Sequence, residues 1–297
     1  MADLRHGDRE RNLARLAYRT FEPLHLIAYF GPHVDAARER IAAGWLSSYA
    51  GMRAAPLGPV PSSVVAAVFF GFNPEAIDRA WTRVLQTHTT GQLNAMRLEV
   101  VDAGLRATLG GLVSDPALAA QAARMREIFS TVTFGGRSLS AAYAALPWPE
   151  VPHLALWHAT TLWREWRGDG HNAILVANGI PPLEALVLYD ASLRGVPRHV
   201  AAGRDRAALQ PSRRWTDEAW LGSADSLAGR GLVSMADGDI MLTDAGAALR
   251  QRVEDATDDA SASVWVGVDG AEDLIGGFRP FSKAVISAGI LPGTQRM

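Results

Sequence analysis

Apolar residues that recur every three or four positions dominate this chain, and this spacing restricts it to a mainly helical fold. One row runs over Leu13–Leu24, and a longer one runs over Leu93–Leu109, where Gly110 follows as the expected helix end. Alternating patterns of the kind that predict strands are almost absent. The sequence therefore predicts a mainly α protein.

The composition excludes several kinds of site and partner. The 297 residues are 48% hydrophobic and 20% charged, which is enough for one large core or two ordinary ones. The chain has no cysteine, so disulfides, thiolate catalysis and cysteine-bound metals are excluded. A formal net charge of -2 gives no overall attraction to nucleic acid. The charged N-terminus lacks a signal-peptide core and the apolar run Val64–Phe72 is too short to span a bilayer, so we expect a soluble cytoplasmic protein without a membrane partner.

Two short apolar runs around Asp237-Gly238 form the best hairpin signal in the chain. A helical segment precedes them, and Thr243 after them is the expected N-cap of a further helix. Helix, small hairpin and helix in this order are typical of a winged helix-turn-helix. The phrases L-x-x-R-G-L-V at 227–233 and L-T-D-A-G-x-A-L at 242–249 resemble the MarR-type winged-helix regulators.

A repeated sequence pattern divides the chain into two related halves. Residues 65–77 and 173–186 share one pattern, in which an apolar helix, a Gly turn and a Pro-opened helix follow each other as in a helix-turn-helix. Three prolines in 146–152 interrupt the helical pattern between them. We therefore expect an N-terminal helix-turn-helix domain over 1–146 and a winged-helix domain over 147–297. The two halves are expected to fold as a pseudo-dimer with a pocket between them, and a homodimer of the whole chain is a further hypothesis.

The chain also carries six short motifs: E-P-L-H-x-x-x-Y-F (22–30), R-A-A-P-L-G (53–58), F-N-P (72–74), L-P-W-P (146–149), L-W-H-A (156–159) and R-E-W-R-G-D-G-H (164–171). Together they resemble one actinobacterial family, whose members are labelled SalK-like or helix-turn-helix proteins. The resemblance covers most of the chain and implies a helix-turn-helix fold without a particular chemistry. Trp166 stands where the family pattern leads us to expect a histidine.

Residues 162–171 place five ionisable side chains around two tryptophans in an otherwise apolar region. Gly168 is expected to end one helix, Asp169 to cap the next, and His171 to lie in its first turn, where unpaired N–H groups favour an anionic ligand. Six side chains are catalytic or charge-holding candidates: His171 and His158 as general acid or base, Glu165 and Asp169 as the orienting carboxylate, and Arg164 and Arg167 as holders of developing negative charge. The alternative is an ion network that only fixes the architecture.

Further ligand-binding candidates lie outside or at the edge of this cluster. His25 and Tyr29 stand one turn apart on the first helix, and either face a ligand or pack between helices. Arg53 can hold a ligand carboxylate or pair with Glu75. Trp166 either fills the core or lines a flat pocket for an aromatic ligand.

Motifs for a metal or a cofactor are absent from the sequence. It contains no H-E-x-x-H, no Walker loop, no G-x-G-x-x-G after a strand and no G-x-S-x-G elbow. We therefore expect neither a metal nor a cofactor.

The expected DNA-reading surface has the wrong charge. Segment 216–227, the expected recognition helix, has three acidic residues and no basic one, and the hairpin carries Asp237 and Asp239. The arginines between Arg194 and Arg214 lie in a segment that we interpret as a solvated loop. DNA binding is thus disfavoured, and a small molecule is the expected partner.

Three functions remain open at this point. The first is a cofactor-independent enzyme of secondary metabolism, a cyclase, isomerase or lyase that applies acid–base chemistry to an aromatic or polyketide-like substrate. The second is a MarR-like, ligand-responsive transcriptional regulator. The third is a structural domain with an ion-paired core.

Overall fold

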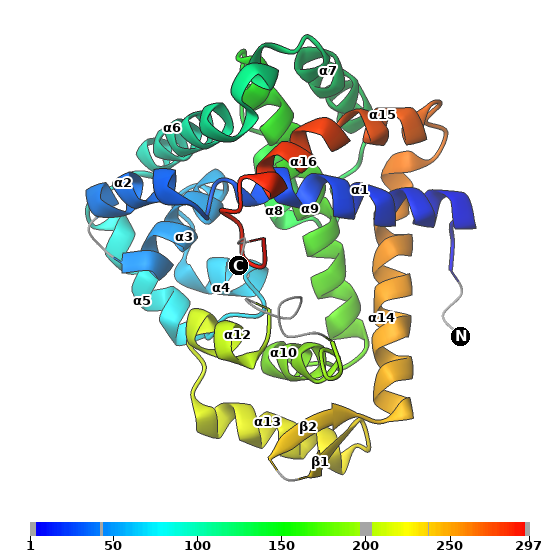
Figure 1. Ribbon diagram of the computed structural model, residues 1–297. Coiled ribbons are helices and arrows are strands. Elements are labelled where there is room, and N and C mark those ends of the chain that lie inside the picture. The colour runs from blue at the N-terminus through cyan, green and yellow to red at the C-terminus, as the bar shows by residue number, and fades with distance from the viewer. Residues whose placement is uncertain (1–3, 42–43, 197–203, 237, 295–297) are drawn as a thin grey trace.

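The computed structural model describes residues 4–41, 44–196, 204–236 and 238–294, and it is mainly helical, as expected (Figure 1). The first helices are α1 (Asp8–Leu26), α2 (Pro32–Ile41), α3 (Gly44–Ala54), α4 (Ser62–Val68), α5 (Pro74–Leu85), α6 (Thr90–Leu109), α7 (Ala117–Ser130) and α8 (Ser138–Ala144). They are followed by α9 (Pro152–Ala177), α10 (Pro182–Ala191), α12 (Arg206–Arg213), α13 (Asp217–Gly229), α14 (Asp244–Ala262), α15 (Ala271–Gly277) and α16 (Arg279–Ser287). Strands β1 (Val233–Ala236) and β2 (Asp239–Leu242) form a small sheet, and 3-10 turns lie at η1 (Ala55–Leu57), η2 (Gly110–Ser114) and η3 (Ser263–Trp265).

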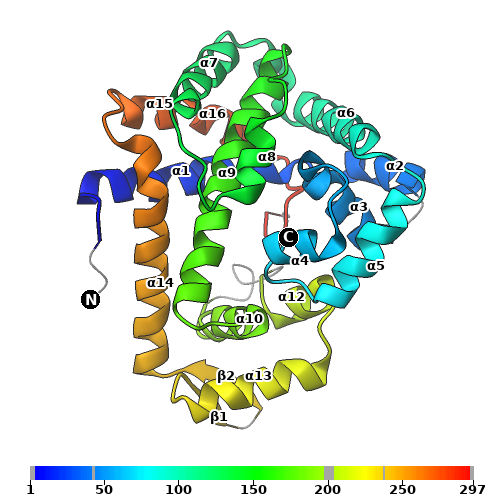
Figure 2. The ribbon, with the colours of Figure 1, turned by 180° about the vertical axis from the view of Figure 1, so that it is seen from behind.

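Two long helices, α9 and α14, form the axis of the molecule. They run side by side in opposite directions, and α1 packs across both (Figures 1 and 2). α9 also packs against α6, α7 and α8. Every residue of α9 from Leu156 to Trp163 is buried, which is expected of a helix that has neighbours on all sides.

Apolar side chains gather in two cores. The larger core combines side chains of α1 to α9 with those of the C-terminal segment from Ala262 to Leu291. The smaller core runs from Leu175 to Val253 and draws on the end of α9, α10, α13, the hairpin and α14. α9 and α14 contribute to both cores and therefore connect them. The domain boundary near 146–152 stays a prediction, and residues from both sides of it share the larger core.

The expected hairpin is present as the antiparallel pair β1–β2. Asp237, at its turn, lies outside the described residues. Val233 and Ile240 turn inward and belong to the smaller core. Thr243 is the N-cap of α14, as expected, since its hydroxyl accepts a hydrogen bond from the backbone N–H of Gly246 at 3.1 Å. The hairpin thus joins α13 to α14 at the end of the molecule remote from α7 (Figure 1).

The expected helix end at Gly168 is wrong, because α9 continues unbroken to Ala177. Asp169 caps a different helix: its Oδ2 accepts a hydrogen bond from the backbone N–H of Ser140, in the first turn of α8, at 2.9 Å. Gly170 makes room for Arg137, since a Cβ built there would lie 2.0 Å from its Nη1. A glycine inside a helix costs about 1 kcal/mol, which the packing around α9 offsets.

α9 and α10 meet at a sharp turn. The two helices are bent by 99° at this break, where Gly179 has a φ of 62° that favours glycine. No single helix in the described part of the chain is long and apolar enough to cross a membrane, and this bent pair passes such a test by length and composition only.

Candidate functional site

The Arg53 guanidinium, at the end of α3, and the Glu165 carboxylate, in the middle of α9, form a buried ion pair. Nε and Nη2 of Arg53 donate to the two oxygens of Glu165 at 2.8 and 2.7 Å, and Nη1 donates to the Tyr49 hydroxyl at 3.0 Å. Burial alone would raise the pKa of Glu165, but the charge of Arg53 outweighs it and lowers this pKa to about 2. Arg53 therefore pairs with Glu165, and the expectation that it could pair with Glu75 is wrong.

Arg164 extends this ion pair to α1. Its Nε lies 3.2 Å from Oε2 of Glu22, and its Nη1 lies 3.6 Å from Oε2 of Glu165. Gly168, one turn later, leaves space for the guanidinium, since a Cβ there would lie 2.9 Å from Nη1 of Arg164. Arg164 and Glu165 thus hold α1, α3 and α9 together. This arrangement fits the alternative of an ion network that fixes the architecture.

His25 and Tyr29 both lie inside the larger core. Nδ1 of His25 lies 3.1 Å from the hydroxyl of Thr161 on α9, and the ring of Tyr29 lies 5.2 Å from that of His25. Burial lowers the pKa of His25 well below its usual value. His25 is therefore a neutral residue at the contact between α1 and α9.

His158 is a buried histidine with an unused nitrogen. Its ring packs edge-on against Trp148 at 4.8 Å, and its Nε2 has no hydrogen-bond partner among the described residues. Burial, together with the charge of Arg97, lowers its pKa to about 3. The ring therefore stays neutral over the physiological range.

Asp169 is held by the N-terminus of α8. Burial raises the pKa of its carboxyl to about 6, although the hydrogen bond from Ser140 opposes this shift. No hydrogen bond between described residues joins Asp169 or Glu165 to His171 or His158, so neither histidine has one of these carboxylates beside it to orient its ring.

Arg167 links α9 to α14 and α1. Its Nη2 lies 3.1 Å from Oδ1 of Asp258 and 3.3 Å from Oε2 of Glu254, and its guanidinium lies over the ring of Tyr18 at 4.3 Å. Arg15 of α1 also pairs with Asp258. This second network connects the two long helices where α1 crosses them.

Trp166 borders a hollow of about 510 Å³ between the end of α7 and the segment 263–268. The guanidinium of Arg137 stacks over its ring at 4.2 Å. Trp166 is therefore separated from the cavity that His171 borders, whose lining does not include it.

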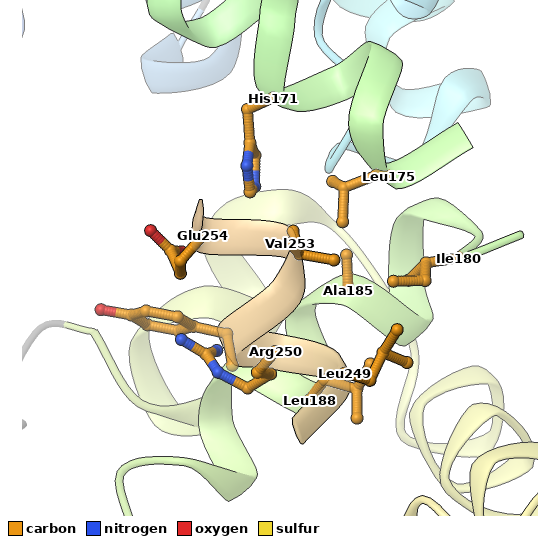
Figure 3. Close-up of a pocket in the computed structure, with 10 residues that line it drawn as sticks. His171, Leu175, Ile180, Ala185, Leu188, Leu249, Arg250, Val253 and Glu254 are labelled. Carbon is orange, nitrogen blue, oxygen red and sulfur yellow. The ribbon is translucent and has the colours of Figure 1, made fainter. Parts of the chain in front are cut away.

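His171 borders a small cavity of about 60 Å³ between α9, α10 and α14 (Figure 3). Its Nδ1 lies 2.9 Å from the hydroxyl of Thr257, and that hydroxyl donates its proton to the carbonyl oxygen of Val253 at 2.7 Å. With that proton directed to Val253, Thr257 accepts from His171, and we assign the neutral ring to the Nδ1–H tautomer on this ground. Burial lowers the pKa of His171 to about 4, while Glu254 opposes that shift.

The cavity has a polar side and an apolar side. Glu254 and His171 lie on one side in Figure 3, and Ile180 and Leu175 lie on the other. The apolar part of the lining comprises Leu175, Ile180, Ala185, Leu188, Leu249 and Val253. Such a lining, apolar with a few polar groups, is the usual composition of a small-molecule site.

Arg250 supplies the cation of this cavity. Its guanidinium lies over the ring of Tyr189 at 5.2 Å, and no described residue forms a hydrogen bond or an ion pair with it. Burial lowers the pKa of Arg250, and Glu254, one turn later on α14, partly opposes this effect. Sequence reasoning missed Arg250, Tyr189 and Glu254, because only the folding of α10 and α14 against α9 brings them to His171.

Of the candidate residues, the structure places His171 beside this cavity and Trp166 beside the other hollow, and it places the rest in the core or in ion pairs between helices. No group of three or more His, Asp or Glu side chains in the described ranges is arranged to hold a metal ion.

Comparison with known proteins identifies the family. A model described as "Helix-turn-helix family" matches residues 14–292, which is most of the chain. No curated protein and no solved structure matches the chain. The chain therefore belongs to this helix-turn-helix family.

Proposed function

We propose that this chain is a small-molecule-binding winged-helix protein, in which the cavity beside His171 controls a unit made of α10, α12, α13 and the hairpin. The observation that carries the proposal is the position of the cavity. Its walls come from α9, α10 and α14, and α9 and α14 connect the smaller core to the larger one. A ligand at this junction changes how the unit packs on the rest of the molecule.

The order of the elements supports the winged-helix assignment. In this proposal α13 takes the place of the recognition helix and β1–β2 that of the wing. The phrases that resemble MarR-type regulators, 227–233 and 242–249, fall on the end of α13, the hairpin and the start of α14. We also propose that the chain belongs to the SalK-like group, which its six short motifs resemble.

Contacts of the first repeated segment, 65–77, with the proposed unit are compatible with the pseudo-dimer. The turn between α4 and α5 docks on the end of α12: the backbone N–H of Asn73 donates to the carbonyl of Arg213 at 3.0 Å, and the indole N–H of Trp215 donates to the carbonyl of Gly71 at 3.0 Å. The first helix-turn-helix segment therefore touches the proposed unit directly.

The chemistry of the cavity favours recognition over acid–base catalysis. Efficient catalytic bases have a pKa close to the working pH, and the pKa values of His171 and His158 lie near 4 and 3. Both oxygens of Glu165 are used by Arg53, and Asp169 caps α8. The enzyme hypothesis, with its aromatic or polyketide-like substrate, thus has less support than ligand binding.

A DNA-reading role has little support from the charges of the unit. Three arginines in the unit or in the turns that follow its helices pair with acidic residues: Arg194 with Asp239 at 3.2 Å, Arg206 with Asp217 at 2.6 Å, and Arg230 with Glu184. Glu218 and Asp225 are exposed on α13. Phosphate binding needs free cations on such a helix, so the transcriptional regulator is the second candidate.

A ligand screen tests the proposal. Ala185→Leu fills the cavity, and Ala248→Leu adds the same side chain to an exposed position of α14. We expect compounds that raise the unfolding temperature of the wild type and of Ala248→Leu, with little effect on Ala185→Leu. If every stabilising compound acts equally on the two variants, the cavity is not the binding site and the proposal fails.

The regulator alternative has its own test. Mobility shifts with the DNA upstream of the coding sequence, at low salt, are expected to show weak binding without sequence preference. A sequence-selective shift that a cavity ligand reverses would instead establish the regulator.

A further inference from the structure

We infer that the cavity between α9, α10 and α14 binds a small apolar carboxylate that also carries one hydrogen-bond donor, such as a short hydroxy or amino acid. This inference rests on the proposed function, because it names the class of molecule that the same cavity takes. Three features of the lining carry it: a cation without a counter-ion, a ring nitrogen that can only accept, and a small apolar wall.

The cation is Arg250. It is partly buried against the ring of Tyr189, and no carboxylate in the described part of the chain lies within ion-pair distance of it. The nearby Glu254 pairs with Arg167 at 3.3 Å instead. A guanidinium that is partly removed from water and lacks a partner binds a carboxylate well, because its two parallel N–H groups match the two oxygens.

The acceptor is Nε2 of His171. Because Nδ1 carries the proton and donates it to Thr257, Nε2 has a free lone pair at the edge of the ring that remains for the cavity. A ligand hydroxyl or ammonium group can donate to it. The carboxylate of Glu254, which also lines the cavity, is a second acceptor for the same donor.

The apolar wall limits the body of the ligand. Leu188 and Leu249 stand with four other apolar residues on the side away from Glu254 (Figure 3). About 60 Å³ of free space accommodates only a few carbon atoms. The carboxylate and the donor must therefore sit close together on a short carbon skeleton, as they do in 2-hydroxy and 2-amino acids.

A matched series of four-carbon probes tests the inference by calorimetry: 2-hydroxybutanoate, 2-aminobutanoate, butanoate and butanamide. We expect 2-hydroxybutanoate or 2-aminobutanoate to bind most tightly, and the difference between the two tells whether a hydroxyl or an ammonium is preferred. Butanoate, which lacks the donor, should bind about fivefold more weakly. Butanamide, which lacks the charge, should bind at least about tenfold more weakly.

Substitutions place the probe in the cavity. Arg250→Met should weaken binding at least about tenfold, whereas Arg252→Met, at an exposed position two residues later, should leave it unchanged. Arg250→Lys keeps the charge without the paired N–H groups and should bind with intermediate affinity. The circular dichroism and unfolding midpoint of each variant show that a loss of binding is not a loss of fold.

Two outcomes would overturn the inference: butanamide that binds as tightly as the acids, or Arg250→Met that binds them as the wild type does. If only neutral compounds bind and Ala185→Leu blocks them, the ligand class is wrong and the proposed function stands. If Ala185→Leu blocks no compound, the proposed function itself fails.

Discussion

The guanidinium of Arg53 and the carboxylate of Glu165 face each other through two hydrogen bonds inside the larger core, with side chains that are 9% and 1% exposed. The two residues lie 112 positions apart in the sequence. Removing both charges from water is costly, and the attraction between them balances that cost only while both are present. The pair thus fixes how the end of α3 sits on α9.

Replacing Glu165 by Gln should lower the free energy of unfolding by about 3–5 kcal/mol, because the charge of Arg53 then stays buried without a carboxylate. Urea unfolding at pH 7 measures the change. Glu127→Gln is the matched control, since Glu127 pairs with Arg124 on the surface of α7 and its loss should cost less than about 1 kcal/mol. Equal small effects of the two substitutions would show that the buried pair does not hold the helices together.

Gly170→Ala is expected to destabilise the protein, although alanine favours helix. Nη1 of Arg137 donates to the carbonyl of Trp166 at 2.5 Å and lies where the new Cβ would be, so the guanidinium must move and lose its bonds. We expect a loss of about 1–2 kcal/mol in urea unfolding. Gly222→Ala, in α13 with open space around it, should instead stabilise by about 0.5–1 kcal/mol.

A double variant separates the two explanations for Gly170. In an Arg137→Met background the clash of Gly170→Ala is relieved, so the alanine should no longer cost stability. A loss that persists there would mean that the glycine serves another purpose than making room for Arg137.

Local sequence signals predicted the parts of the fold that depend on near neighbours. The helical spacing of Leu93–Leu109 gave α6, the turn at Gly238 gave the hairpin, and Thr243 was correctly expected as a cap. The helix end predicted at Gly168 is wrong. The prediction was made because a glycine before an acidic residue is typical of a helix junction. The actual role of Gly168 is to accommodate the side chain of Arg164, and spacing alone does not reveal such a contact.

The candidate site was predictable only in part, for the same reason. The polar cluster of α9 was found from its composition, and the alternative of a structural ion network describes Arg164 and Arg167 well, with partners on α1 and α14. His171 was identified, but its surroundings were not. Arg250 and Tyr189 belong to no motif, and nothing in the sequence indicates that an arginine lacks a partner in the folded chain.

Asp169 should make stability depend on pH. Burial raises the pKa of its carboxyl from 3.8 to about 6, so its ionised form is less favourable in the folded than in the unfolded state. Its contribution to stability is therefore fully present below about pH 3.8 and is lost as the pH rises through about 6. Asp169→Asn keeps an oxygen for the N–H of Ser140 and removes the charge. Between pH 4 and 7, we expect the free energy of unfolding of Asp169→Asn to rise relative to that of the wild type, by at most about 3 kcal/mol.

Urea unfolding at several pH values between 4 and 7.5 measures this gain. Asp169→Ala is the comparison, since it removes both the charge and the cap of α8, and loss of a cap costs about 1 kcal/mol at every pH. A difference between Asn variant and wild type that stays constant over this range would contradict a raised pKa at Asp169.

His171 should be observed as a neutral imidazole with its proton on Nδ1 down to acidic pH. Burial lowers its pKa to about 4, and the hydroxyl of Thr257 is already committed to the carbonyl of Val253, so it accepts from Nδ1. The nitrogen shifts of the ring in two-dimensional NMR distinguish the two tautomers and give the pKa. Thr257→Val removes the acceptor, so the variant should show a mixture of tautomers. A wild-type neutral ring protonated on Nε2 would mean that Nε2 is not the free acceptor of the cavity, and the ligand would then need an acceptor rather than a donor at that position. A ring that titrates near 6.5 would contradict the lowered pKa.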